Sequence, residues 1–156
     1  MRSAQQWFDE YGDSHQNPLN KFIHWICVPL IFWCVLALLW EIPVPHQFRS
    51  APVPMNWAIL VSALMLAWYF VMNRVIAAGM LVITVAALLI AWAVDAFADS
   101  PLWLIALAIF LLAWIGQFLG HHIEGRRPSF FKDLQFLLIG PAWLLGFVYR
   151  RFGIAY

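Results

Sequence analysis

Long apolar runs separated by short polar segments make up most of this chain. Each run is bounded by polar or turn-forming residues, and four of them are long: residues 18–40, 57–72, 75–94 and 101–120. A helix rises about 1.5 Å per residue, so about 20 apolar residues cover the roughly 30 Å hydrocarbon core of a bilayer. The pattern therefore predicts four full membrane spans within residues 18–120.

A fifth apolar run, residues 134–149, is shorter and contains Gly140-Pro141. A run of this length is short for a full crossing, and an internal proline interrupts the hydrogen bonds of a helix. We therefore expect a short, kinked or re-entrant segment that turns back to the face it left. The predicted fold class is all-α, a polytopic membrane helical bundle with four full spans plus this fifth segment.

Residues 1–17 are expected to form an interfacial segment that lies on the membrane surface. Ser3 and Gln6 have the spacing of a capping box, and aromatic residues follow at helical spacing. Asn17 and Pro18 fit the N-cap and the first position of the next helix. With residues 121–133 as a polar site segment, residues 1–156 are predicted to form a single integral membrane domain.

Composition supports a membrane-embedded protein. The chain is 64% hydrophobic and 11% charged, with a mean hydropathy of +0.78, whereas soluble domains are about a quarter charged. The formal net charge of +1 gives no indication of a nucleic-acid surface. The two cysteines, Cys27 and Cys34, lie inside the first apolar run and are interpreted as small apolar residues.

Two groups of polar residues interrupt the apolar pattern at the ends of predicted spans. The first comprises His15, Asn17, Asn20 and His24, and the second comprises Gln117, His121, His122, Glu124, Arg126 and Arg127. Ionisable residues at the edge of an apolar run are costly, which makes them candidates for function. Four spans separate the two groups, and an even number of crossings returns the chain to the side it left. The two groups are therefore expected to meet.

Basic residues indicate which side of the membrane carries these groups. Most of them fall on the same side as the polar groups, namely Arg2, Lys21, Arg74, Arg126, Arg127 and Lys132, whereas the opposite loops hold Arg49. Because cytoplasmic loops carry an excess of Lys and Arg, we expect the polar groups on the cytoplasmic face. That face belongs to the inner membrane in a bacterium or to the endoplasmic reticulum in a eukaryote.

The spacing within the second group fits a metal site. On a continued fourth helix, Gln117, His121 and Glu124 share one face, while His122 points about 100° away. A His and a carboxylate three positions apart can bind a common metal, and imidazole plus carboxylate suits non-haem Fe(II), although zinc and copper also accept imidazole. The same histidines also fit a polar helix end at the lipid headgroups. Arg126 and Arg127 fit either a carboxylate-binding site or a headgroup anchor.

These residues form two motifs, Y-G-x-x-H-x-N-x-x-N-x-x-x-H from Tyr11 to His24 and W-x-x-Q-x-x-G-H-x-x-E-G-x-x-P from Trp114 to Pro128. Together they resemble the small membrane-protein family that includes the yeast 2-hydroxy fatty acid dioxygenase of phytosphingosine breakdown. The middle spans match that family in hydrophobicity only. The resemblance implies an Fe(II)-dependent enzyme that performs α-oxidation and shortens a long-chain 2-hydroxy fatty acid by one carbon.

The resemblance also implies roles for individual residues. The metal site and catalytic residues are expected to be His15, His24, His121 and Glu124, in which Glu124 either binds the metal or orients an imidazole. His122 is a weaker candidate. A 2-hydroxy acid can chelate Fe(II) through its carboxylate and hydroxyl oxygens. The expected substrate-binding residues are Arg126 and Arg127, which meet the carboxylate, and Asn17 and Asn20, which fix the loop and the ring orientation.

Two other functions fit the same residues. One is a non-enzymatic membrane protein that binds lipid or acts as a scaffold, and the other is a zinc-dependent lipid hydrolase. Bound iron favours the oxygenase, bound zinc the hydrolase, and no metal the scaffold. All three place the chain in a membrane in contact with a lipid or a fatty acid, and the sequence leaves the oligomeric state open.

Overall fold

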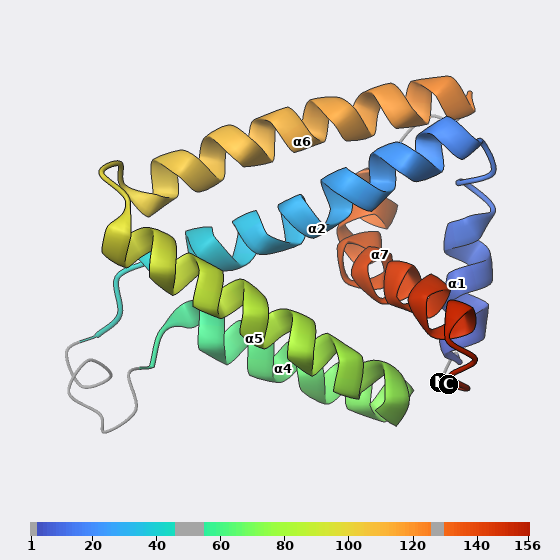
Figure 1. The fold of residues 1–156 in the computed structure, drawn as a ribbon, viewed down its shortest axis with the longest axis horizontal. Helices are drawn as coiled ribbons and strands as arrows, with labels where there is room; N and C mark the ends of the chain where they lie inside the picture. Colours follow the sequence, from blue (N-terminus) through green and yellow to red (C-terminus); the bar gives the residue numbers. More distant parts are fainter. Residues whose placement is uncertain (1–2, 46–54, 126–129) are drawn as a thin grey trace.

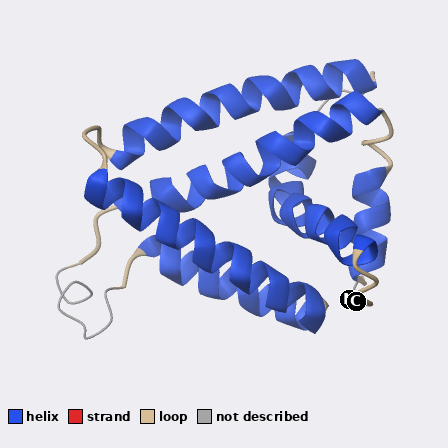
Figure 2. Cartoon of the chain, viewed as in Figure 1, coloured by secondary structure: helices blue, strands red, loops and turns tan. Residues whose placement is uncertain are grey.

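The chain folds into a bundle of helices in the computed structural model, which describes residues 3–45, 55–125 and 130–156, without the side chains of 130–135. Within these residues there are six helices and no strand (Figure 2). The helices are α1 (Ala4–Gly12), α2 (Pro18–Glu41), α4 (Trp57–Met72), α5 (Arg74–Phe97), α6 (Leu102–Glu124) and α7 (Phe130–Arg151). The predicted all-α class is confirmed.

The predicted span boundaries lie close to those of the observed helices. Three helices, α2, α5 and α6, are long and apolar enough to cross a membrane, whereas α4 has 16 residues. A helix of 16 residues is about 24 Å long, less than the hydrocarbon core. The count of four full spans therefore stays a prediction. Helix α6 continues to Glu124, so most of the second motif lies on a helix.

Helices α2 and α6 pack side by side along their length (Figure 1). Their contact depends on the glycine pair of α6, since a Cβ atom added at Gly116 would lie 2.6 Å from the Cys27 sulfur. A Cβ atom at Gly120 would meet the Asn20 side-chain oxygen. A pair of glycines four positions apart lets a neighbouring helix approach closely in this way.

Helix α1 lies across the end of the bundle at which α2 begins and α6 ends (Figure 1). Its start is fixed by the predicted capping box, in which the Gln6 amide donates to Ser3 Oγ at 3.2 Å and the Ser3 amide donates to Gln6 Oε1 at 2.9 Å. Asn17 caps α2, because its side-chain oxygen accepts from the Leu19 amide at 2.9 Å. Both predicted helix starts are confirmed.

Helix α7 is longer than the predicted apolar segment 134–149 and runs through Pro141 without a break. Proline lacks an N–H, which leaves a carbonyl in the preceding turn without its usual donor. That carbonyl belongs to Leu137, and at the next residue the Tyr69 hydroxyl of α4 donates to the Leu138 carbonyl oxygen. Residues 130–133, which the hydropathy pattern assigned to the polar segment, form the first turn of α7.

Both ends of the described part of α7 remain at the same end of the bundle. Trp40 donates to Asp95, so α2 and α5 finish together, and both helices begin on the opposite side of the bundle, where they lie apart (Figure 1). Near the start of α7, Phe136 packs edge-on against Tyr11, with ring centroids 5.1 Å apart. Near its end, the Tyr149 hydroxyl donates to the Val75 carbonyl oxygen at the start of α5. Whether this segment turns back within a membrane stays a prediction.

Candidate metal centre

Three histidines converge where α2 begins and α6 ends. His15 lies in the loop between α1 and α2, His24 lies on α2, and His121 lies in the last turn of α6. One ring nitrogen of each histidine lies within 4.8 Å of a ring nitrogen of the other two. The structure thus brings the two sequence motifs together, as the even number of predicted spans required. The three residues are called the histidine cluster below.

Backbone carbonyl groups fix the orientation of two of the rings. His15 Nδ1 lies 2.6 Å from the Tyr11 carbonyl oxygen, and His24 Nδ1 lies 2.9 Å from that of Asn20. A carbonyl oxygen only accepts hydrogen bonds, so each Nδ1 carries a proton and each Nε2 presents a lone pair in the neutral ring. Carbonyl groups commonly orient metal-binding imidazoles in this way.

The two Nε2 atoms face one another. They lie 2.9 Å apart, and the His121 ring centroid lies 5.5 Å from that of His15 and 5.3 Å from that of His24. Two lone pairs at such a distance repel unless a proton or a metal ion lies between them. The geometry of this pair therefore calls for a cation.

Burial makes the proton the less favourable cation. The side chains of His15 and His24 are 2% and 1% exposed. Burial lowers the pKa of His15 to about 4, although the hydrogen bond to the Tyr11 carbonyl acts in the opposite direction. At neutral pH this ring is uncharged and its Nε2 lone pair is available. Three converging imidazoles form a ligand set suited to iron, zinc or copper.

Aromatic residues hold the His15 ring in place. Tyr11 stacks on it with ring centroids 4.2 Å apart and an interplanar angle of 10°. Trp143 of α7 lies 5.6 Å from the same ring and 5.0 Å from Tyr11. The loop histidine is thus packed between α1 and α7, which restricts the direction of its Nε2 lone pair.

The Glu124 carboxylate contacts the loop rather than joining the histidine cluster. It accepts hydrogen bonds from the Gln16 amide at 2.7 Å, from the Asn17 amide at 3.0 Å and from Asn20 Nδ2 at 2.8 Å. These donors come from the segment that carries His15 and from the first turn of α2. The carboxylate thus holds the loop that carries His15, and the choice between its two expected roles stays a prediction.

The two asparagines expected near the substrate have partners within the protein. Asn17 caps α2 through its side chain. Asn20 is fully buried and donates to Glu124 and, at 3.4 Å, to the Ser14 carbonyl oxygen. These contacts agree with a role in fixing the loop and the ring orientation. Gln117 is also buried and lies beside the His24 imidazole.

The remaining expected residues lie elsewhere. His122 is exposed on the other side of α6, in keeping with its spacing. Arg126, Arg127 and Pro128 lie outside the described residues.

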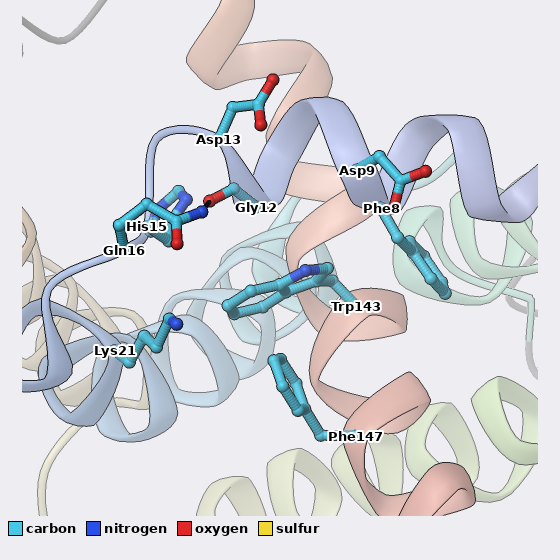
Figure 3. Close-up of a pocket in the computed structure, with 9 residues that line it drawn as sticks. All are labelled: Phe8, Asp9, Gly12, Asp13, His15, Gln16, Lys21, Trp143 and Phe147. Carbon is cyan, nitrogen blue, oxygen red and sulfur yellow. Dashed lines mark hydrogen bonds between the residues drawn. The ribbon is translucent and has the colours of Figure 1, made fainter.

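A cavity beside the histidine cluster was not predicted from the sequence. It has a volume of about 370 Å³ and lies between α1, the start of α2 and α7 (Figure 3). Its lining residues are Phe8, Asp9, Gly12, Asp13, His15, Gln16, Lys21, Trp143 and Phe147. The sequence contains no signal that joins Trp143 and Phe147 to the first motif, because only tertiary packing brings them together.

Comparison with known proteins identifies relatives of this chain. A family model described as Mpo1-like: 2-hydroxy-palmitic acid dioxygenase Mpo1-like matches residues 1–152. The chain is 29% identical over 147 residues to the 2-hydroxy-palmitic acid dioxygenase MPO1 of Saccharomyces cerevisiae, an alignment that covers 93% of this chain and 77% of the yeast protein. No solved structure matches the chain.

Proposed function

The chain belongs to the Mpo1-like family, and on this premise we propose that it is an iron-dependent dioxygenase of the membrane. Its reaction is the α-oxidation of a long-chain 2-hydroxy fatty acid to the acid one carbon shorter. The name of the yeast relative supports a 2-hydroxy fatty acid as substrate. The apolar helices support a substrate that reaches the site from the bilayer.

The observation that carries the proposal is the pair of facing Nε2 atoms in the histidine cluster. A neutral His15 and a buried His24 at 2.9 Å need a cation between or beside them. His15, His24 and His121 are proposed to hold Fe(II), and Glu124 is proposed to fix the loop that carries His15. Fe(II) held at this position would activate O2, which does not react unaided with most organic substrates.

The protein's own residues position the substrate and exclude water. Arg126 and Arg127 are proposed to meet the substrate carboxylate, since a guanidinium binds a carboxylate through two parallel hydrogen bonds. The burial of His15 and His24 keeps water away from their lone pairs. Asn17 and Asn20 keep the loop and the start of α2 in place through their hydrogen bonds.

The proposed reaction balances with O2 as the only oxidant. A 2-hydroxy acid and one O2 give the acid one carbon shorter, one carbon dioxide and one water. The C1–C2 bond breaks, and C2 is oxidised from an alcohol to a carboxyl group. An added 2-oxo acid is not needed.

The site is proposed to lie on the cytoplasmic face. Lys21 and Arg74 stand at the end of the bundle that carries the histidine cluster, and α7 ends there in Arg150 and Arg151. This excess of positive charge supports that orientation. Cysteines introduced at Asp13 and at Gly153 should react with an impermeant reagent added to the cytoplasmic side of inverted vesicles.

The decisive test is an assay under ¹⁸O₂ with the purified protein, Fe(II) and 2-hydroxyhexadecanoic acid. The product should be the acid one carbon shorter with ¹⁸O in its carboxyl group, as measured by mass spectrometry. Hexadecanoic acid should react poorly, because it lacks the second chelating oxygen. An unlabelled shortened acid, or equal turnover after zinc replaces iron, would rule out the dioxygenase.

A further inference from the structure

The cavity beside the histidine cluster contains one cation that points into it. The Lys21 side chain is half-buried and reaches the space between His15 and Trp143 (Figure 3). The two carboxylates at its edge, Asp9 and Asp13, are exposed. Asp13 points away from the cavity in the same view, and Asp9 accepts a hydrogen bond from Gln5 on the outer surface of α1 at 2.7 Å. The part of the cavity next to Lys21 therefore favours an anion.

The wall opposite His15 is apolar and continues towards the lipid. Trp143 and Phe147 line the cavity, with ring centroids 4.6 Å apart. Phe147 also contacts Trp25 of α2, at 6.2 Å between ring centroids, and Trp25 is 43% exposed. Lys21 and Trp25 are four positions apart and share one face of α2. Along this face of α2, the Lys21 ammonium group is thus followed by the apolar Trp25 side chain, which leads towards the bilayer.

The size of the cavity fits the head of an amphiphile better than a whole lipid. Its volume of about 370 Å³ is at the lower end of the range for ligand pockets. A long acyl chain would have to leave it, and the exposed Trp25 marks the apolar exit. His15 belongs both to the cavity wall and to the histidine cluster, so a head group bound here would lie next to the cluster.

We propose that this cavity binds the carboxylate head of the long-chain 2-hydroxy acid through Lys21, with the acyl chain leaving past Phe147 and Trp25. The inference rests on the proposed function and adds Lys21 to Arg126 and Arg127 as a cation that meets the substrate carboxylate. An ammonium group pairs with a carboxylate as a point charge, and its partial burial strengthens the pair relative to one in open water.

The test measures binding without turnover. The purified protein in nanodiscs is titrated anaerobically with 2-hydroxyhexadecanoic acid and with hexadecane-1,2-diol, which has the same chain and no carboxylate. Lys21→Met should weaken binding of the acid about ten- to a hundredfold, the range for loss of a hydrogen bond to a charged group, and leave binding of the diol unchanged. Lys21→Arg should restore most of the binding, and Asp13→Asn, whose carboxylate points away, should bind like the wild type.

Three results would overturn the inference. If Lys21→Met binds the acid like the wild type, while the wild type still shortens the acid, the proposed function stands and the role of Lys21 is wrong. If Lys21→Met weakens binding of the acid and binding of the diol equally, Lys21 shapes the cavity and does not recognise the carboxylate charge. If the wild type neither binds nor converts the acid, both the inference and the proposed function are wrong.

Discussion

His15 Nε2 and His24 Nε2 lie 2.9 Å apart, while the Nδ1 atom of each ring contacts a backbone carbonyl oxygen. Both rings therefore turn their free lone pairs towards the same point, and His121 approaches it from α6. Protons compete poorly for this point, because burial lowers the pKa of His15 to about 4. The arrangement links a local backbone feature, the two carbonyl contacts, to the chemistry proposed for the site.

The first prediction concerns the ligands. His15→Ala, His24→Ala and His121→Ala should each lose most of the bound metal, because each removes one of three converging imidazoles. Metal content is measured by inductively coupled plasma mass spectrometry on protein that still elutes as a folded species. His122→Ala is the matched control, because His122 is adjacent to His121 in the sequence but its side chain is exposed. This variant should keep its metal. Full occupancy in all three variants would show that the ligand assignment is wrong.

The second prediction separates the two roles considered for Glu124. Its carboxylate accepts from two backbone amides and from Asn20, so Glu124→Ala leaves these donors without a partner. We expect metal affinity to fall by about ten- to a hundredfold, the usual effect of removing a group that orients a ligand. Glu124→Gln, which keeps one acceptor oxygen, should lose less. Complete loss of metal in both variants, equal to that of His24→Ala, would instead indicate a direct ligand.

The third prediction concerns the proline-containing helix α7. Tyr69 is fully buried, and its hydroxyl donates to the Leu138 carbonyl oxygen. Tyr69→Phe should lower the free energy of unfolding by about 1–3 kcal/mol, the cost of a buried group left without its partner. Tyr149→Phe removes an exposed hydroxyl contact with the Val75 carbonyl, and water can replace it, so the loss should be below about 1 kcal/mol. Denaturant unfolding in detergent measures both, and equal losses would contradict the buried role.

The fourth prediction concerns pH. The pKa of folded His15 is about 4, below its ordinary value of 6.5, so the unfolded chain binds a proton first as the pH falls. The folded state should therefore lose stability from about pH 6.5 down to about pH 4. Metal-free wild-type protein should show a steeper fall of its unfolding temperature over this range than His15→Gln, which cannot titrate. Parallel curves for the two proteins would contradict a buried neutral ring.

The sequence was sufficient to predict the helices and the meeting of the two motifs. Hydropathy and cap residues placed the start of α2 at Pro18 and both ends of α4 as observed. The even number of apolar runs put His15 and His121 on one side, and the structure brings them together. These features depend on local patterns or on a simple count of crossings.

Other features depend on contacts that no local pattern encodes. The spacing of His121 and Glu124 places both on one face of α6. It does not reveal that the Glu124 carboxylate accepts hydrogen bonds from the Gln16 and Asn17 amides. The cavity depends on packing of α7 against α1 and α2, so the role of Trp143 could not be predicted. The extension of α7 beyond 134–149 was missed because Lys132 and Asp133 in its first turn interrupt the apolar pattern.

The hydrogen bond from Asn20 to Glu124 joins residues 104 positions apart. At a synthesis rate of about 5–20 residues per second, Asn20 leaves the ribosome roughly 5–20 s before its partner. During that interval the nascent chain exposes a pair of imidazoles without α6 to enclose them. The histidine cluster is complete only after α6 has been inserted, so binding of the proposed iron ion is expected to follow membrane insertion rather than accompany it.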